Sequence, residues 1–226
     1  MPPMPSHRIL FASEFTASAF LLMAVVGSGI AAERLSGGNA GLALLVNAIA
    51  TGCALVPLIL SFGPVSGAHM YPVVSLAAAD LGLLSWRKVP YYVLAQCTGA
   101  VAGVWIAHVM FDLQVVQTSA HARGGMGQWC GEFVATIGLL GTILRCHAGG
   151  LPLVAGAVAT YITGAYWFTS STSFANPAVT LARTLTDTFA GIRPADAPAF
   201  VAAQMLALIV VVLAARLLRS HQAASS

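Results

Sequence analysis

Six long apolar stretches constrain the fold of this chain more than any other feature of its sequence. Each is long enough to cross the roughly 30 Å hydrocarbon core of a bilayer as a helix. Apolar residues make up 58% of the chain and charged residues only 8%, against about 25% charged in soluble domains. Open strands are excluded, because lipid offers no partners for backbone groups. We therefore predict an all-α membrane protein whose transmembrane helices lie at residues 9–32, 40–62, 89–110, 129–146, 151–169 and 197–218.

The first apolar stretch also has some features of a signal peptide, because Arg8 precedes it and two alanines end it. However, it is about 20 residues long, enough to span a bilayer. It also contains Glu14, and a matching Glu132 recurs later in the chain. We interpret the stretch as the first transmembrane helix.

Two further segments, residues 69–81 and 176–188, are about half as long as the others. A dozen helical residues cover about 16–18 Å, half the thickness of a bilayer. Each segment follows an approach rich in small and polar residues, 63–68 and 170–173. Irregular backbone of this kind is tolerated at membrane depth where it is buried in protein or lines a wet cavity. We predict two re-entrant half-helices.

The order of these elements occurs twice, in repeats at about residues 9–110 and 129–219 of a single domain, 1–226. Each repeat holds three spanning helices, and three is odd, so the second repeat enters the membrane from the opposite side. The repeats are therefore inverted, related by a pseudo-two-fold axis in the membrane plane, and the N-termini of the half-helices meet near the midplane. The matching positions are Glu14 and Glu132, Gln96 and Gln204, and Tyr71-Pro72-Val73 and Asn176-Pro177-Ala178.

Asn176 is a strong N-cap, and Pro177 suits the first helical position, where its missing N–H is not needed. In this context Ser173-Phe174-Ala175-Asn176-Pro177-Ala178-Val179-Thr180 resembles the second signature box of the aquaporin and aquaglyceroporin family. The segment Ser66-Gly67-Ala68-His69-Met70-Tyr71-Pro72-Val73-Val74 resembles the first box. The resemblance implies two re-entrant half-helices, one pore per subunit and a homotetramer.

The paired half-helices place partial positive charge at the centre of the pore, which repels cations and lets neutral solutes pass. Glu14 and Glu132 are costly at membrane depth and should face the protein interior. The resemblance implies that they hold the approach loops by hydrogen bonds. His69 is expected either to bond to loop backbone or to line the lumen as a donor.

Two positions depart from the family pattern. Tyr71 stands where the first box usually has Asn, and either its hydroxyl points toward the lumen or its ring turns and narrows the centre. Val179 stands where the family normally has Arg. Counting back from the boxes places the selectivity filter at Thr51, Gly164, Ser173 and Val179.

That filter would hold no aromatic residue and no cation, so we expect it to be wide and partly apolar. Arg183 lies one helical turn beyond Val179. Its side chain either leans toward the mouth and restores positive charge, or anchors loops or pairs with Asp187. Cys53 is two residues from Thr51, which on a helix points to a different face.

A wide filter without Arg resembles the aquaglyceroporins of bacterial arsenic-resistance operons. That resemblance implies a passive channel for arsenous acid, methylated arsenicals or antimonite, with glycerol and water. The alternatives are a glycerol and water facilitator without a metalloid role, or a gradient-coupled secondary transporter. We find no nucleophile with a base and no metal-binding spacing, and so expect no enzyme, metal or cofactor.

The expected partners are small neutral solutes and the lipid bilayer, and the net charge of +3 gives no reason to propose a nucleic acid. We expect a multi-pass protein of the bacterial inner membrane with both termini cytoplasmic. Basic residues favour that orientation by six to four. The inner set is Arg8, Arg87, Lys88, Arg145, Arg216 and Arg219, and the outer set is Arg34, Arg123, Arg183 and Arg193.

Overall fold

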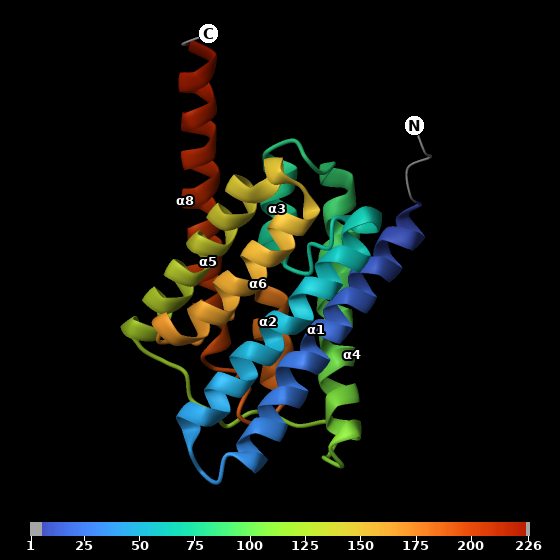
Figure 1. Cartoon of the computed structure of the whole chain (residues 1–226), viewed down its shortest axis with the longest axis vertical. Helices are drawn as coiled ribbons and strands as arrows, with labels where there is room; N and C mark the ends of the chain where they lie inside the picture. The colour runs from blue at the N-terminus through green and yellow to red at the C-terminus, as the bar shows by residue number, and fades with distance from the viewer. Residues whose placement is uncertain (1–5, 225–226) are drawn as a thin grey trace.

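The computed structural model describes residues 6–224, with side chains described to residue 220. Six of its helices are long and apolar enough to cross a membrane (Figure 1). They begin and end within a few residues of the predicted stretches, with the largest extensions at the C-terminal ends of the second and last helices. These are α1 (His7–Leu35), α2 (Ala40–Ser66), α4 (Val89–Met110), α5 (Met126–Cys146), α6 (Leu151–Phe168) and α8 (Ala197–Ala224).

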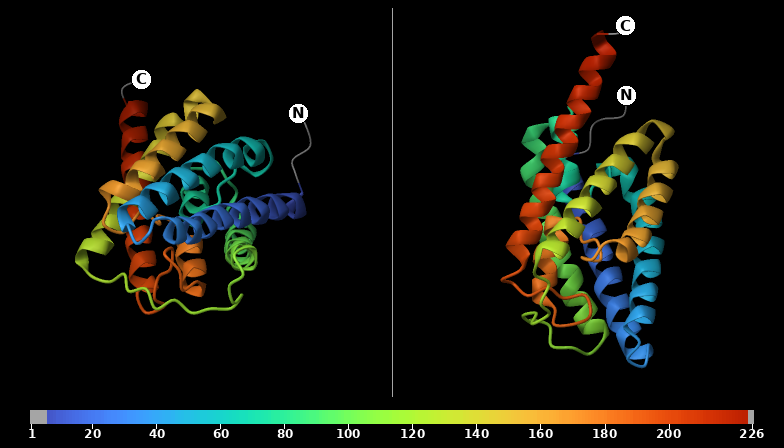
Figure 2. Two further views of the ribbon diagram at one scale, coloured as in Figure 1. Left: turned by 60° about the horizontal axis from the view of Figure 1, so that its bottom comes forward. Right: turned by 90° about the vertical axis from the view of Figure 1, so that its left-hand side faces the viewer.

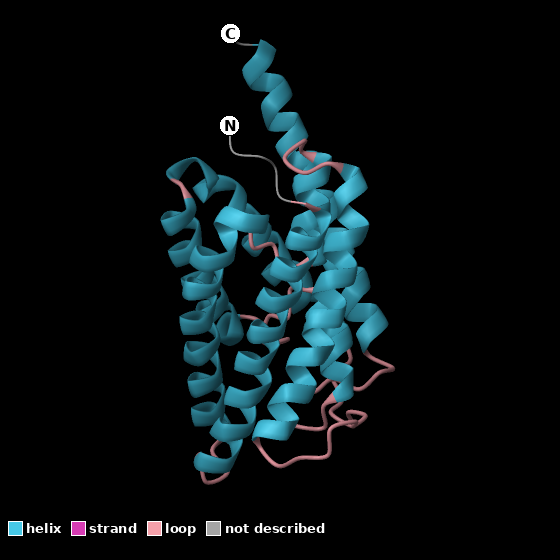
Figure 3. Ribbon diagram, turned by 90° about the vertical axis from the view of Figure 1, so that its right-hand side faces the viewer, coloured by secondary structure: helices cyan, strands magenta, loops and turns pink. Residues whose placement is uncertain are grey.

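The long helices surround two short ones, α3 (Pro72–Asp80) and α7 (Pro177–Ala182). Helix α1 packs against α2 and α4, α5 packs against α6 and α8, and the α2–α6 contact joins the two halves. The start of α1 and the end of α8 lie at one end of the bundle, which we call the terminal end (Figures 1 and 2). The long connections after α4 and α7 cross the opposite end, which we call the loop end (Figure 3).

Close contact between α1 and α4 depends on two glycines spaced four residues apart. A Cβ atom at Gly99 would overlap the carbonyl of Phe15, and one at Gly103 would overlap the carbonyl of Ala19. Small residues at this spacing let two helix backbones approach closely in a membrane. The two helices therefore pack closely, and α4 also contacts the first half-helix.

The first half-helix, α3, runs over most of its predicted segment, but the second is shorter than predicted. Helix α7 ends at Ala182, and a 3₁₀ turn, η3 (Arg183–Leu185), follows. The returning chain explains the early end, because the carbonyl of Arg183 accepts a hydrogen bond from Ile192 N at 3.1 Å instead of continuing a helix. At Thr186 the backbone is already extended.

The last helix is tied to the far end of the first half-helix. Arg216 of α8 forms a two-pronged ion pair with Asp80, the last residue of α3. One turn further along, Arg219 Nη1 donates to the carbonyl of Leu81 at 3.1 Å. Two cations therefore lie at the C-terminus of α3, where the helix dipole favours positive charge. Two further 3₁₀ turns, η1 (Trp86–Lys88) and η2 (His147–Gly149), precede α4 and α6.

Candidate functional site

The N-termini of the two half-helices meet in the middle of the bundle. Asn176 caps α7, since its Oδ1 accepts from Ala178 N at 2.9 Å and from Val179 N at 3.3 Å. Its Nδ2 donates across the junction to Met70 O at 3.0 Å. Tyr71 occupies the equivalent position before α3 but makes no side-chain cap. The junction is therefore asymmetric, with one half-helix capped by its own side chain and the other not.

Each approach loop is held by a fully buried glutamate. Glu14 accepts from His69 N at 2.9 Å and Met70 N at 2.8 Å, from Ser66 Oγ at 2.7 Å and from Gln96 Nε2 at 2.8 Å. Hydrogen bonds to a charged acceptor are roughly twice as strong as neutral ones. These four donors offset the cost of burying the carboxylate.

Glu132 repeats the arrangement in the second half of the chain. It accepts from Phe174 N at 2.8 Å, Ala175 N at 2.9 Å and Gln204 Nε2 at 2.6 Å. Gln204 also bonds to Thr180 Oγ1 at 2.9 Å, as Gln96 does to Ser75 Oγ at the same distance. The two networks therefore share two loop N–H donors, one glutamine and a hydroxyl partner of that glutamine.

The backbone of the loops repeats as well. Ala68 and Met70 have φ values of +48° and +54°, and Ser173 and Ala175 have +51° and +49°. Residues with a side chain rarely adopt this left-handed conformation, which costs of order 1–3 kcal/mol each. The glutamate contacts described above lie directly beside these residues and hold the strained backbone in place.

A cavity of about 510 Å³ opens on the terminal-end side of α3. Tyr71, His69, Tyr92 and Lys88 contribute to its lining. His69 Nδ1 lies 3.0 Å from Ser75 Oγ, so its ring bonds to a side chain of α3 and also lines the cavity, rather than bonding to loop backbone.

A second, much smaller cavity of about 10 Å³ lies toward the loop end. We call it the outer constriction; it has room for roughly one water. It contains three of the four residues predicted for the filter, Thr51, Ser173 and Val179. Its lining is Leu21, Val25, Thr51, Tyr71, Ile162, Tyr166, Ser173, Phe174, Val179 and Arg183.

The prediction for Gly164 was wrong. Gly164 is exposed on the outside of α6, whereas Ile162 and Tyr166, one turn apart, face the constriction. The Tyr166 hydroxyl lies 3.3 Å from Thr51 Oγ1. The buried face of α6 determines which of its residues point to the constriction. Gly164 is two positions from Tyr166 and therefore points to another side of the helix.

The expected wide opening without aromatic residues or a cation is also not observed. Tyr166 and Phe174 fill the space that the small predicted residues leave, and Arg183 supplies the charge. The Arg183 guanidinium carbon lies 3.4 Å from the centre of the Phe174 ring, and its Nε donates to Ala190 O. Asp187 instead accepts from Ala120 N at 2.8 Å, so Arg183 anchors a loop and faces the constriction but does not pair with Asp187.

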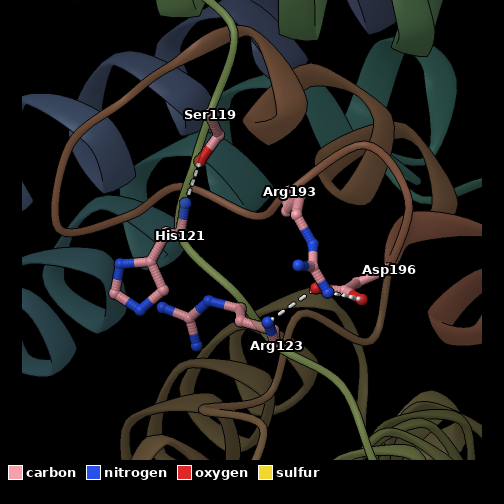
Figure 4. A network of polar contacts seen from close by, with 5 residues as sticks. All are labelled: Ser119, His121, Arg123, Arg193 and Asp196. Atoms are coloured by element: carbon pink, nitrogen blue, oxygen red, sulfur yellow. Dashed lines mark hydrogen bonds and ion pairs between the residues drawn. The ribbon is translucent and has the colours of Figure 1, made fainter.

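A second arginine, Arg123, ties the loop end together; from the sequence it was expected only as one of the basic residues of the outer set. Arg123 donates from its backbone N to Asp196 Oδ2 and from Nε to Gly191 O, both at 2.8 Å. Arg193 Nη2 bonds to the other Asp196 oxygen at 2.9 Å (Figure 4). Burial lowers the pKa of Arg123 to about 10, so it remains charged at neutral pH. Burial and the charges of Arg123 and Arg183 also lower the pKa of His121.

Some polar groups of residues that line the constriction have no hydrogen-bond partner among the described residues. Ser173 Oγ is buried without a hydrogen-bond partner, and no partner for the Arg183 Nη atoms is found within residues 6–224. Cys53 is exposed and contributes to neither cavity. Among the described residues, no cluster of His, Cys, Asp or Glu could hold a metal ion.

Comparison with known proteins agrees with this architecture. The family model of the major intrinsic proteins matches residues 5–166. The chain belongs to the major intrinsic protein family, the family of the aquaporins. This is a family of membrane channels, and the chain is a membrane channel of the aquaporin type.

Two relatives and one solved structure illustrate the range of similarity. Aquaglyceroporin AqpS of Rhizobium meliloti (strain 1021) is 50% identical, over 87% of this chain and 84% of its own. The probable aquaporin NIP7-1 of Arabidopsis thaliana is 32% identical, over 56% of this chain and 46% of its own. The X-ray structure of the aquaglyceroporin from Plasmodium falciparum has the same fold, with a TM-score of 0.72, 19% identity and coverage of 92% of this chain and 95% of that one.

Proposed function

We propose that this aquaporin is a passive channel for trivalent metalloid hydroxides, arsenous acid above all, and for glycerol and water. Antimonite and methylated arsenicals belong to the same class of small neutral solutes. Arsenous acid and glycerol each carry three hydroxyl groups and no charge, so one pore lined with hydroxyl partners serves both.

The observation that carries the proposal is the chemistry of the outer constriction. Three residues that carry a hydroxyl, Thr51, Tyr166 and Ser173, line it together with Arg183, and the Thr51 and Tyr166 hydroxyl oxygens lie 3.3 Å apart. Ser173 Oγ has no protein partner, so a solute hydroxyl satisfies it at no cost to another contact. The apolar side chain of Val179 has no hydrogen-bond donor, so this position does not favour water over larger neutral solutes.

Charge at the same place supports selectivity for neutral solutes. Arg183 is 2% exposed and lies in a region of low dielectric constant, where its field on a passing cation is strong. The two half-helix N-termini add partial positive charge beneath it. Cations are therefore opposed at two successive levels.

The similarity to a protein named an aquaglyceroporin, at 50% identity, is a second support. A homotetramer with one pore per subunit, in the bacterial inner membrane with cytoplasmic termini, completes the proposal. Large apolar side chains exposed on the outer faces of the bundle, such as Leu94, Ile106 and Leu213, are suited to contact with lipid or neighbouring subunits.

A gradient-coupled transporter is less well supported. Such proteins bind coupling ions with intramembrane carboxylates. Here Glu14 and Glu132 have 0% exposure, and both are engaged by loop N–H groups. Neither carboxylate faces a cavity.

Stopped-flow measurements on proteoliposomes test the proposal. We expect uptake of arsenous acid and glycerol well above that of protein-free vesicles, with rates that do not saturate and that ignore imposed proton or sodium gradients. Glycerol flux without arsenous acid flux would select the facilitator without a metalloid role. Flux that collapses with an ion gradient would select the transporter, and no flux of either solute would refute the channel reading.

A further inference from the structure

Tyr71 lies at the boundary between the two cavities. Among the described residues, it alone lines both the 510 Å³ cavity and the outer constriction. Tyr71 is only 5% exposed. Asn176, its counterpart in the other half, contributes to neither cavity, and its amide bonds to Met70 O at the junction. The partition between the cavities is therefore built around Tyr71.

The backbone of Tyr71 is fixed. A residue before proline is restricted to extended conformations, and Tyr71 has φ −126° and ψ 121° before Pro72. Its carbonyl accepts from Val74 N at 3.0 Å and Ser75 N at 3.1 Å. Any rearrangement at this point is therefore a rotation of the side chain and not a movement of the loop.

Space for such a rotation exists on one side only. The outer constriction holds about 10 Å³ and is bounded by Tyr166, Phe174 and Arg183, whereas the terminal-end cavity holds about 510 Å³. A ring that makes way for a solute must therefore turn toward the terminal end.

The hydroxyl group of Tyr71 is unused by the protein. Within residues 6–224 no hydrogen bond from this hydroxyl is found, and it is not among the fully enclosed polar atoms that lack a partner, so it is accessible from a cavity that Tyr71 lines. Tyr71 lines the same constriction as Thr51 and Tyr166, whose hydroxyl groups pair with each other. A solute that leaves that pair therefore meets the Tyr71 hydroxyl next.

We propose that Tyr71 is the residue that sets the size limit for solutes, by closing the pore between the two cavities with its ring and pairing its hydroxyl with the passing solute. The inference rests on the proposed function, because it requires that neutral solutes pass at all. It assigns the size limit to the centre of the molecule and not to the outer constriction alone.

The test uses a graded series of neutral polyols, glycerol, erythritol and ribitol, with the full-length protein in proteoliposomes. We expect the unmodified channel to pass glycerol and exclude ribitol. Tyr71→Asn, which supplies an N-cap to α3, and Tyr71→Ala should each raise ribitol flux several-fold while water flux changes much less. Tyr71→Phe keeps the ring and should still exclude ribitol, but it should pass glycerol more slowly.

Tyr161→Phe is the matched control. Its hydroxyl bonds to the α5 backbone at Val134 and Ala135 and lines neither cavity, so its polyol fluxes should equal those of the unmodified protein. If folded Asn and Ala variants exclude ribitol as before, or if the Phe variant admits it, the inference is overturned while the channel function stands. Absence of glycerol and arsenous acid flux in the unmodified protein would instead refute the proposed function.

Discussion

The guanidinium of Arg183 stacks on the ring of Phe174, with its central carbon 3.4 Å from the ring centre. Arg123 approaches the same ring at 5.1 Å. A cation over an aromatic face is stabilised by the ring quadrupole, by about 2 kcal/mol or more where water is excluded. The ring thereby holds a charge at the constriction although the position after the second box, Val179, is apolar.

Replacing Arg183 with glutamine should make the channel leak cations. At 4 Å and an effective dielectric constant of about 20, a unit charge opposes a cation by about 4 kcal/mol. We expect sodium flux to rise by at least roughly tenfold, which corresponds to about 1.4 kcal/mol, with glycerol flux retained. Arg34→Gln is the control, because Arg34 is exposed and contacts Phe111 O outside the constriction. Equal sodium flux in both variants would show that Arg183 does not exclude cations from the pore.

Introducing arginine at Val179 should reduce the flux of glycerol and arsenous acid more than that of water. The constriction already holds only about 10 Å³, and a second guanidinium would add bulk and fixed donors beside Arg183. Val179→Met adds length without charge and separates the two effects. Light-scattering traces for each solute measure the change, and equal losses for all solutes would mean that Val179 does not face the pathway.

Glu132→Gln should destabilise the protein. The amide keeps one oxygen for the loop but turns an NH₂ group toward the second N–H, so one charge-assisted bond is lost, at roughly 1.5–3 kcal/mol. A lower midpoint of thermal unfolding in detergent is the expected result, and Glu14→Gln should behave in the same way. Glu33→Gln, at an exposed position, should leave the midpoint unchanged. A midpoint for Glu132→Gln equal to that of the control would contradict the role of the loop contacts.

Low pH should lower the stability of the protein through protonation of Asp196 at the loop end. Its hydrogen bond from Arg193 holds the pKa of Asp196 below the ordinary value of 3.8, so the carboxylate stabilises the fold above that pH. The contribution is lost as the pH falls through the lowered pKa. Thermal midpoints measured on either side of pH 4 should therefore drop on acidification, and Asp196→Asn should reduce the drop. An unchanged drop in the Asn variant would assign the acid sensitivity to other groups.

The sequence predicted those parts of the molecule that depend on local pattern. The spans follow from apolar runs, and the pairing of Glu14 and Glu132 with the approach loops follows from the family resemblance. Gly164 was misplaced because counting residues from a box assumes one helix rotation, whereas the rotation of α6 depends on which of its faces packs against α2. The width of the selectivity filter was overestimated because Tyr166 and Phe174, which are not among the four predicted filter residues, also line the constriction.

The ties between α8 and the end of α3 have a consequence for how the protein is made. Arg216 and Arg219 follow the first half-helix by more than a hundred residues, yet they hold its C-terminus. During synthesis, the contacts of Arg216 and Arg219 with the end of α3 therefore form only after the last helix has been made and inserted. The pore is complete only when its final segment is in place, because a chain without the end of α8 would lack both contacts at the C-terminus of α3.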